Sequence, residues 1–247
     1  MSDSKSWYLD PLVAKQKAAV NHGLVVRWAD ATRGGAVLKT DLFEEANGAD
    51  HILDRLGALG SPVVGMDCVA QTVVRAHQQH SSSGVMMTVS DLRAMNFRDG
   101  TFDLGVSTST LDHFRSRSEF IQSLEELARI TKPGGTMILT LDNPWNLTYW
   151  PLRLLCYYVA PFSLGYTVTR RRLRKDMESL GLRTRGVDYV IHNPRMLSTL
   201  IFLAIRKALG KAADLPIAAL IQLFEWIGKL PTKPLTACFS AICFEKR

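Results

Sequence analysis

Hydrophobic residues in the middle of the chain fall into short runs, and these runs alternate with longer segments of helical spacing. The runs are rich in Val, Ile, Leu, Met and Thr and end in a polar residue, as buried strands do; they cover 36–42, 61–67, 84–91, 101–108 and 135–142. The segments between them, 50–60, 69–80 and 118–135, repeat apolar residues at helical spacing, and the last closes with Pro133 and Gly134. This alternation predicts a parallel, doubly wound sheet.

The pattern changes after residue 142. Residues 143–166 are aromatic and apolar, but Pro151, Arg153 and Pro161 interrupt them, so they do not predict a membrane-spanning helix. The remaining segments are predicted as a helix (170–181), a strand (182–192), two apolar helices (194–210 and 215–230) and a final strand (236–246). The final strand is apolar on both sides, which predicts that it is inserted into the interior of the sheet.

Composition and length indicate one globular unit. The chain has 247 residues, of which 47% are hydrophobic and 21% charged, and this suits one large α/β domain with an appended cap. The four cysteines, Cys68, Cys156, Cys238 and Cys243, show neither CxxC spacing nor a histidine at metal-ligand spacing, so we interpret them as reduced core residues. The N-terminus lacks the pattern of a signal peptide, and a cytoplasmic protein is expected.

The positive charge lies in the C-terminal part, because residues 1–150 carry a net charge of −3 and residues 151–247 one of +10. Its densest run is RRRLRK, residues 170–175. Such a run can contact phosphates, anionic lipid or an acidic acceptor, although a solvated helix face is the more common explanation.

Acidic residues end the second and third predicted strands, where parallel sheets bind their ligands. Asp67 follows Gly48 by about 20 residues, the spacing at which a carboxylate reaches a ribose hydroxyl; the alternative is a cap for the next helix. Asp91 could accept the exocyclic amine of an adenine while Leu92 packs on its ring.

The segment AVLKTDLFEEANGAD, residues 36–50, joins the first strand to the next helix without the closely spaced glycines of a phosphate loop. Its carboxylates, Asp41, Glu44, Glu45 and Asp50, would repel a pyrophosphate, so NAD is a poor candidate. S-adenosylmethionine has no phosphate and carries a sulfonium and an ammonium, which carboxylates tolerate. Lys39 or a backbone N–H could meet its own carboxylate.

These residues resemble a class I S-adenosylmethionine-dependent methyltransferase. The resemblance spans residues 36 to about 142 and rests on VVGMD, SDLRAMNFRDGTFDLGVSTSTLDHF and ELARITKPGGTMILTLDNP in that order. It implies S-adenosylmethionine as cofactor and a doubly wound, seven-stranded mixed sheet of Rossmann-like type with helical cap insertions. The sequence departs from the family at the first motif, where only Gly48 stands for the usual alternating glycines.

The resemblance also implies roles for individual residues. Ribose binding falls to Asp67 beside Cys68, adenine contact to Asp91 and Leu92, and a floor near the sulfonium to Ser107 and Thr108. The cofactor contacts expected in the first loop are Lys39, Thr40, Asp41, Phe43 and Glu45. Within one domain, residues 1–35 form an N-terminal helical cap, 36–142 the cofactor-binding core, and 143–247 the rest of the sheet with acceptor-cap insertions at 143–168 and 194–232.

A base could assist transfer to a hydroxyl. Asp112 and His113 follow the fourth strand, and His113 has a pKa suited to that work, with Asp112 as its orienting partner; packing and helix-capping roles are the alternatives. The other histidines suggest no metal site: His77 and His80 are interpreted as a solvated helix face, while His22, His51 and His192 are isolated.

The cap segments are rich in aromatic and aliphatic residues, which favours a small lipophilic or aromatic acceptor methylated at oxygen or nitrogen, although core packing explains the same composition. Peripheral docking to membrane lipid is a further hypothesis, and the oligomeric state is left open. There are two alternatives to a methyltransferase for small molecules: a non-catalytic methyltransferase-like binding protein and an RNA-modifying methyltransferase. Nucleic acid is not expected as a partner, because long apolar helices interrupt the basic residues.

Overall fold

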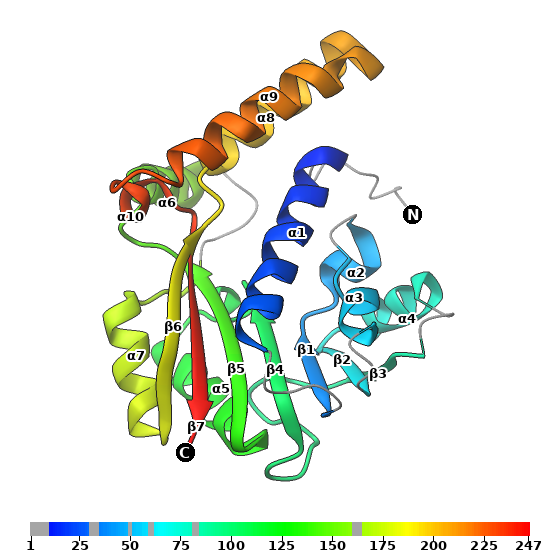
Figure 1. Ribbon diagram of the computed structural model, residues 1–247, viewed down its shortest axis with the longest axis vertical. Coiled ribbons are helices and arrows are strands. Elements are labelled where there is room, and N and C mark those ends of the chain that lie inside the picture. The colour runs from blue at the N-terminus through cyan, green and yellow to red at the C-terminus, as the bar shows by residue number, and fades with distance from the viewer. Residues whose placement is uncertain (1–9, 30–34, 49–50, 59–61, 81–83, 160–164) are drawn as a thin grey trace.

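A computed structural model describes residues 10–29, 35–48, 51–58, 62–80, 84–159 and 165–247 of the chain. Its centre is a sheet of seven strands in the order β3-β2-β1-β4-β5-β7-β6 (Figure 1). The strands are β1 (Val37–Thr40), β2 (Val63–Asp67), β3 (Met86–Val89), β4 (Phe102–Thr108), β5 (Thr131–Asp142), β6 (Leu182–Val190) and β7 (Phe239–Lys246). The strand β7 runs antiparallel to both β5 and β6, and the other pairs are parallel. The predicted mixed sheet and the interior place of the last strand are confirmed.

Helices cover both faces of this sheet. They are α1 (Pro11–Trp28), α2 (Phe43–Asn47), α3 (Leu53–Gly57), α4 (Ala70–Gln79), α5 (Arg117–Ile130), α6 (Tyr149–Val159), α7 (Arg170–Ser179), α8 (Arg195–Leu209), α9 (Asp214–Ile227) and α10 (Lys233–Thr236), with 3-10 turns η2 (Leu111–His113) and η3 (Gly210–Ala213). Alternate strand residues point to opposite faces. Accordingly, Leu38 packs with α5 and α7 in one core, whereas its neighbour Val37 packs with α1, α3 and α4 in another.

Local sequence signals set the ends of α5. Ser116 and Glu119 form a reciprocal capping box at its N-terminus. The helix ends at Ile130, three residues before Pro133, and the chain turns directly into β5. Gly134 has a φ of 76°, a left-handed conformation that glycine adopts without the strain of a Cβ. The predicted helix stop is therefore correct to within a few residues.

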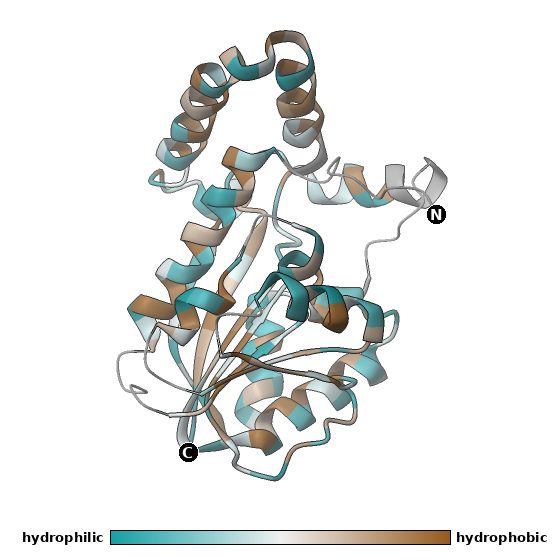
Figure 2. Cartoon of the chain, turned by 90° about the vertical axis from the view of Figure 1, so that its right-hand side faces the viewer, coloured by the Kyte–Doolittle hydropathy of each residue, from teal (hydrophilic) through white to brown (hydrophobic). Residues whose placement is uncertain are grey.

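The helices α8 and α9 form a hairpin that projects beyond the sheet, with hydrophobic segments on both helices (Figure 2). A small core of its own joins it to the start of α1, through Val13, Phe202, Ala213 and Ile217. Arg206 of α8 lies 2.7 Å from the buried carboxylate of Asp10, the N-cap residue of α1. Among the described residues, none of the helices is long and apolar enough to cross a lipid bilayer.

The cysteines differ in their environments. Cys238 and Cys243 are buried, as predicted, but Cys68 is exposed, so the expectation of a core residue is wrong there. Cys68 directly follows the last residue of β2, where the strand emerges from the sheet. The side chain of Cys156 lies outside the described residues.

Candidate active site

The site begins where the winding of the sheet reverses, between the neighbouring parallel strands β1 and β4. After β1 the chain continues to β2 and β3 on one side of the sheet, and after β4 it continues to β5 on the other side. The connections that follow the two carboxyl ends therefore run in opposite directions. Each strand is followed by a left-handed residue that is not glycine, Asp41 with a φ of 65° and Ser109 with a φ of 54°. Such backbone conformations are uncommon and concentrate at binding sites, as does the switch point of a doubly wound sheet.

Asp67 ties the end of β2 to the loop after β1. Its Oδ2 accepts the backbone N–H of Leu42 at 3.0 Å, and its Oδ1 accepts that of Val69 at 2.8 Å. A carboxylate offers about four lone-pair sites, so these two bonds leave acceptor capacity for a ligand. Asp67 thus shapes the site and retains acceptor capacity for hydroxyl groups.

Three carboxylates from successive strand ends converge on this edge. Cys68 is exposed, but partial desolvation by its neighbours raises the pKa of the thiol, and the negative charges of Asp67, Asp91 and Asp41 raise it further. Burial also raises the pKa of Asp41, against the opposing effect of the Lys39 ammonium. The three carboxylates thus bring negative charge to the edge between β1, β2 and β3, where Lys39 and Arg93 balance part of it.

Asp91 is held by an arginine that the sequence analysis did not single out. The Arg93 guanidinium donates to both Asp91 oxygens, at 2.7 Å for the shortest bond, and reaches Glu119 of α5 at 2.7 Å. These bonds lower the pKa of Asp91, so the carboxylate is ionised at neutral pH. The two-residue spacing of an acid and an arginine just after a strand was the available signal. Leu92, between them, is buried.

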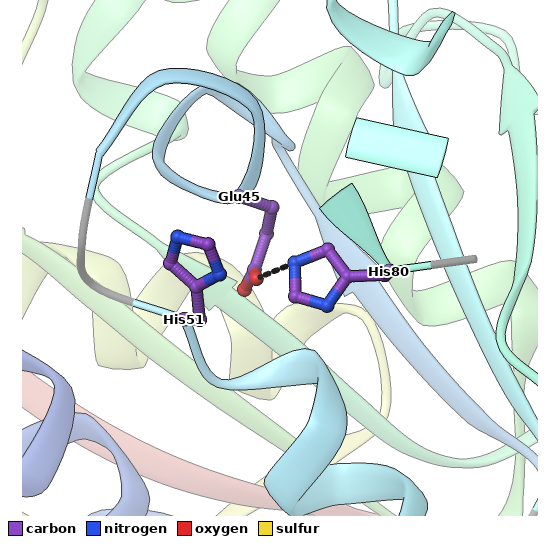
Figure 3. A group of neighbouring side chains, drawn as sticks. All are labelled: Glu45, His51 and His80. Atoms are coloured by element: carbon purple, nitrogen blue, oxygen red, sulfur yellow. Dashed lines mark ion pairs between the residues drawn. The ribbon is translucent and has the colours of Figure 1, made fainter. Parts of the chain in front are cut away.

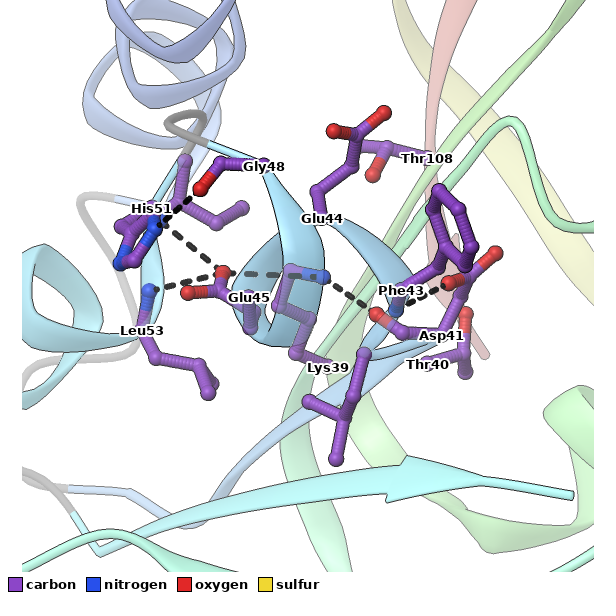
Figure 4. A network of polar contacts seen from close by, with 12 residues as sticks. Lys39, Thr40, Asp41, Phe43, Glu44, Glu45, Gly48, His51, Leu53 and Thr108 are labelled. Carbon is purple, nitrogen blue, oxygen red and sulfur yellow. Dashed lines mark hydrogen bonds and ion pairs between the residues drawn. The ribbon is translucent and has the colours of Figure 1, made fainter. Parts of the chain in front are cut away.

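The loop after β1 divides its predicted site residues between two sides (Figure 4). Lys39 is buried and donates to the carbonyl of Asp41, and its ammonium also lies 3.7 Å from Glu45 Oε1. Glu45 is fully buried, and Oε1 accepts the backbone N–H groups of the chain that enters α3. In contrast, Asp41 Oδ1 accepts the backbone N–H of Phe43 within the turn, and the side chain of Phe43 is exposed.

The end of β4 brings further candidates together. Thr40 of β1 shares a hydrogen bond of 3.0 Å with Thr110, and Ser107 is fully buried whereas Thr108 is partly exposed. Asp112 is buried in η2, and its Oδ2 accepts the backbone N–H of Asp142, so it joins η2 to the end of β5.

His113, the next residue, is exposed at the rim of the site. It lies in η2, which starts directly after Thr110, and the Thr110 hydroxyl is bonded to Thr40 at the end of β1.

A tyrosine and an arginine lie on the far side of Asp112. Arg153 of α6 donates to the hydroxyl of Tyr149, one helical turn earlier, at 2.9 Å, and also to the carbonyl of Gly165 at 3.1 Å. Burial raises the pKa of Tyr149, and the charges of Asp142 and Asp112 add to that effect. Both residues fall within the predicted cap segment 143–168, and their four-residue spacing on a helix was the signal for a pair.

The environments of the histidines differ most from those predicted. His77 is exposed, but His80 is buried, so the prediction that both lie on a solvated helix face is wrong for His80. Its ring lies 2.9 Å from Glu45 and 2.8 Å from Asp54, with the ring centroid of His51 at 4.9 Å. His51 is therefore not isolated either. The carboxylates that accept His80 lie 35 and 26 residues before it in the sequence, beyond the reach of local pattern.

Comparison with known proteins agrees with this arrangement. Residues 43–139 match the family model of the methyltransferase domain. The chain is 24% identical over 173 residues to the mitochondrial ubiquinone biosynthesis O-methyltransferase of Homo sapiens, covering 65% of this chain and 46% of that protein. The corresponding protein of Rattus norvegicus is 26% identical over 159 residues, covering 60% and 45%. The chain spans about half the length of these curated relatives.

Solved structures share the fold at low identity. A S-adenosylmethionine-dependent methyltransferase from Methanosarcina mazei superposes with a TM-score of 0.59 at 14% identity, over 90% of this chain and 96% of that one. A geranyl diphosphate methyltransferase, solved in complex with GPP and sinefungin, gives a TM-score of 0.62 at 14% identity, over 93% of this chain and 77% of that one. With the methyltransferase-domain match over residues 43–139, the curated relatives and the strand order in agreement, the core of this chain is identified as a class I S-adenosylmethionine-dependent methyltransferase domain.

Proposed function

We propose that this chain transfers a methyl group from S-adenosylmethionine to an oxygen or nitrogen of a small lipophilic or aromatic acceptor. The observation that carries the proposal is the position of Asp41, Asp67 and Asp91 at the ends of three neighbouring parallel strands, with the Asp67 carboxylate bonded to Leu42 next to Asp41. These three carboxylates accept hydrogen bonds and carry negative charge, so they fit a cationic nucleoside without phosphate. They would repel a pyrophosphate.

The proposed contacts to the cofactor are made by side chains that can accept further hydrogen bonds. Asp67 would bind the ribose hydroxyls beside Cys68, and the half-buried carboxylate of Asp41 would face the positively charged end of the cofactor. Asp91 would reach the adenine amine while it stays bonded to Arg93, and Leu92 would contribute its backbone. Lys39 and Glu45 would not contact the cofactor directly, because both are buried and bonded to the loop itself.

The bound cofactor would supply an electrophilic methyl group, and the protein would hold the acceptor in line with it in a site that excludes water. Ser107, Thr108 and Ser109 would form the floor at the end of β4. His113 would accept the proton of an acceptor hydroxyl, and Asp112 would act as a positioning residue, since it fixes η2 against β5. The Tyr149–Arg153 pair would line the acceptor side.

The cap supports a lipophilic acceptor. A groove of about 1140 Å³ lies between α1, the end of β6 and α9, and its walls combine aliphatic residues such as Leu12, Val20 and Ile221 with charged ones such as Lys15 and Asp188. Trp145, in the turn before α6, and Trp150, in its first turn, are more than half exposed. Aromatic rings and aliphatic walls suit an apolar small molecule better than a polar one.

The test is incubation of the chain with methyl-labelled S-adenosylmethionine and, in parallel, a panel of phenols and amines, a lipid extract and total RNA. Label in a small molecule supports the proposal, and label in RNA replaces it with the nucleic-acid alternative. Cofactor binding without any labelled product favours the non-catalytic binding protein. An absence of binding by the folded chain contradicts both.

Peripheral contact with anionic lipid is a second part of the proposal, supported by the α8–α9 hairpin. Leu200, Leu215 and Trp226 are more than half exposed there, and Lys207, Lys211 and Lys229 lie on the same hairpin. Exposed apolar residues beside lysines are typical of helices that rest at a bilayer interface. Flotation with vesicles containing phosphatidylserine is expected to recover the chain, and a Leu215→Ser/Trp226→Ser variant is expected to stay in the dense fraction. Equal recovery with neutral vesicles would refute the electrostatic component.

A further inference from the structure

A second cluster of polar side chains lies beneath the loop after β1. Glu45 comes from α2, His51 from the segment before α3, and His80 from the C-terminal end of α4. One donor atom from each of the three lies within 4.8 Å of the other two. Figure 3 shows both imidazole rings beside the Glu45 carboxylate. Three segments that are separate in the sequence thus direct two nitrogen donors and one oxygen donor to one point.

The outer nitrogen of each ring is already bonded. His80 Nδ1 lies 2.8 Å from Asp54 Oδ1, and His51 Nε2 lies 2.9 Å from the carbonyl oxygen of Gly48. Both acceptors require an N–H on that side of the ring, which leaves His80 Nε2 and His51 Nδ1 as lone-pair donors when the rings are neutral. Histidines that bind metals usually donate their other N–H to a carboxylate or a backbone carbonyl in this way.

The carboxylate of Glu45 is fixed before any cation arrives. Its side chain is fully buried, and Oε1 accepts the N–H groups of Ile52 and Leu53 at 3.0 and 3.3 Å. The other oxygen, Oε2, lies 2.9 Å from His80 Nε2. One oxygen therefore builds the loop and the second faces the histidines.

The charge around the cluster can balance a divalent cation. Glu45 and Asp54 supply two negative charges, and neutral imidazoles add none. The nearest described cation, Lys39, lies 3.7 Å from Oε1, the oxygen that faces away from His80, and it also donates to the Asp41 carbonyl. In the absence of a metal, a protonated His80 between Glu45 and Asp54 would satisfy the same carboxylates.

We propose that Glu45, His51 and His80 bind one Zn²⁺, with Asp54 and the Gly48 carbonyl orienting the two rings. Two imidazoles and a carboxylate are a known zinc ligand set, and water would complete a tetrahedron. Donors at 2.0–2.1 Å from a tetrahedral zinc lie roughly 3.4 Å from one another, so His80 Nε2 and Glu45 Oε2, now 2.9 Å apart, would separate by about 0.5 Å while His51 moves towards them by about 1 Å. The half-buried ring of His51 has room to make that movement. The ion would clamp α2, α3 and α4 behind the cofactor loop, a structural role independent of the reaction.

The test is a competition titration of the tag-free, full-length chain with Zn²⁺ and a chromophoric chelator, alongside thermal unfolding with Zn²⁺, Mg²⁺ or EDTA. The expected result is one Zn²⁺ per chain with submicromolar Kd, and a Tm that rises with Zn²⁺ but not with Mg²⁺, which prefers oxygen ligands. No stoichiometric binding by folded protein would overturn the proposal.

His51→Gln is the principal variant, because its partly exposed ring can be replaced with little risk to the fold. It is expected to weaken zinc binding at least tenfold, and Asp54→Ala by about 10- to 100-fold through loss of orientation. His77→Gln, on the exposed face of α4, is the matched control and keeps wild-type affinity. If His51→Gln binds zinc as the wild type does, the ion is bound elsewhere and the assignment is wrong.

Discussion

The carboxylate of Asp67 accepts the backbone N–H of Leu42, 25 residues earlier in the chain, at a distance of 3.0 Å. The residue proposed to bind the ribose therefore also fixes the loop in which the family's glycines would stand. Hydrogen bonds from the Asp67 carboxylate to backbone N–H groups therefore fix the shape of the loop after β1. Of the family's glycine pattern, only Gly48 is present in this segment.

Asp67→Asn is expected to weaken the binding of S-adenosylmethionine and its demethylated product by about 10- to 150-fold. A hydrogen bond to a charged group contributes roughly 1.5–3 kcal/mol, and the amide loses that charge while it keeps the shape of the side chain. Isothermal titration calorimetry measures the change. Asp99→Asn, on an exposed loop, serves as the control, and unchanged affinity in folded Asp67→Asn would remove the ribose assignment.

Asp41→Asn is expected to raise the stability of the cofactor-free chain and to lower its affinity for the cofactor. Burial raises the pKa of Asp41, so its ionised form is disfavoured in the folded state. Asparagine also adopts the left-handed conformation and can still accept the Phe43 N–H. Denaturant unfolding and calorimetry test the two effects, and a loss in both would indicate a purely structural role.

The same residue gives a pH dependence with a defined sign. A carboxyl whose pKa is higher in the folded than in the unfolded state is protonated in both states at low pH, and its penalty develops as the pH rises above about 3.8. The stability gap between Asp41→Asn and wild type is thus expected to be near zero below that pH and to widen towards neutrality. A constant gap at every pH would show that Asp41 ionisation is not its source.

His113→Gln is expected to lower kcat by about 10²- to 10⁴-fold with a hydroxyl acceptor, and to leave KM within a few-fold of the wild type. Glutamine keeps a polar side chain at the rim but cannot accept a proton at neutral pH. The pH profile of kcat is expected to lose its acidic limb in the variant. His77→Gln is the control, and an equal kcat in both variants would leave positioning as the only contribution of η2.

Ser116→Ala is expected to lower the free energy of unfolding by about 1 kcal/mol, because it removes the N-cap of α5 and half of the capping box. Ser118→Ala, two residues on, removes a hydroxyl that bonds only to Ser116 among the described residues and is expected to change little. Chemical denaturation with a shared slope compares the two. Similar losses would mean that the cap is not the stabilising element.

The sheet could be predicted because each strand carries its own signal. Consecutive residues such as Val37 and Leu38 are both apolar since helices cover both faces, and that local property is visible in the sequence. The polar partners of the site are not local. Asp91 was foreseen as a strand-end acid, but its bond to Arg93 and the reach of Arg93 to Glu119 depend on how α5 packs.

The same reason explains His80. Periodicity places it on the same helix as the exposed His77, and only the tertiary fold brings Glu45 and Asp54 against its ring. Burial of a histidine depends on partners that local spacing does not identify. Cys68 shows the converse, a residue type that is usually buried but becomes exposed because it follows the end of β2.

The α8–α9 hairpin enters between β6 and β7, which pair without a break from Val190 to Gly186 next to the insertion and, after a register shift, from Thr184 to Leu182. A continuous ladder below the insertion means that the segment between the two strands can lengthen, shorten or be replaced without a change in sheet register. The proposed acceptor cap is therefore separable from the cofactor edge: exchange of the hairpin would leave the strand ends that carry Asp41, Asp67 and Asp91 in place.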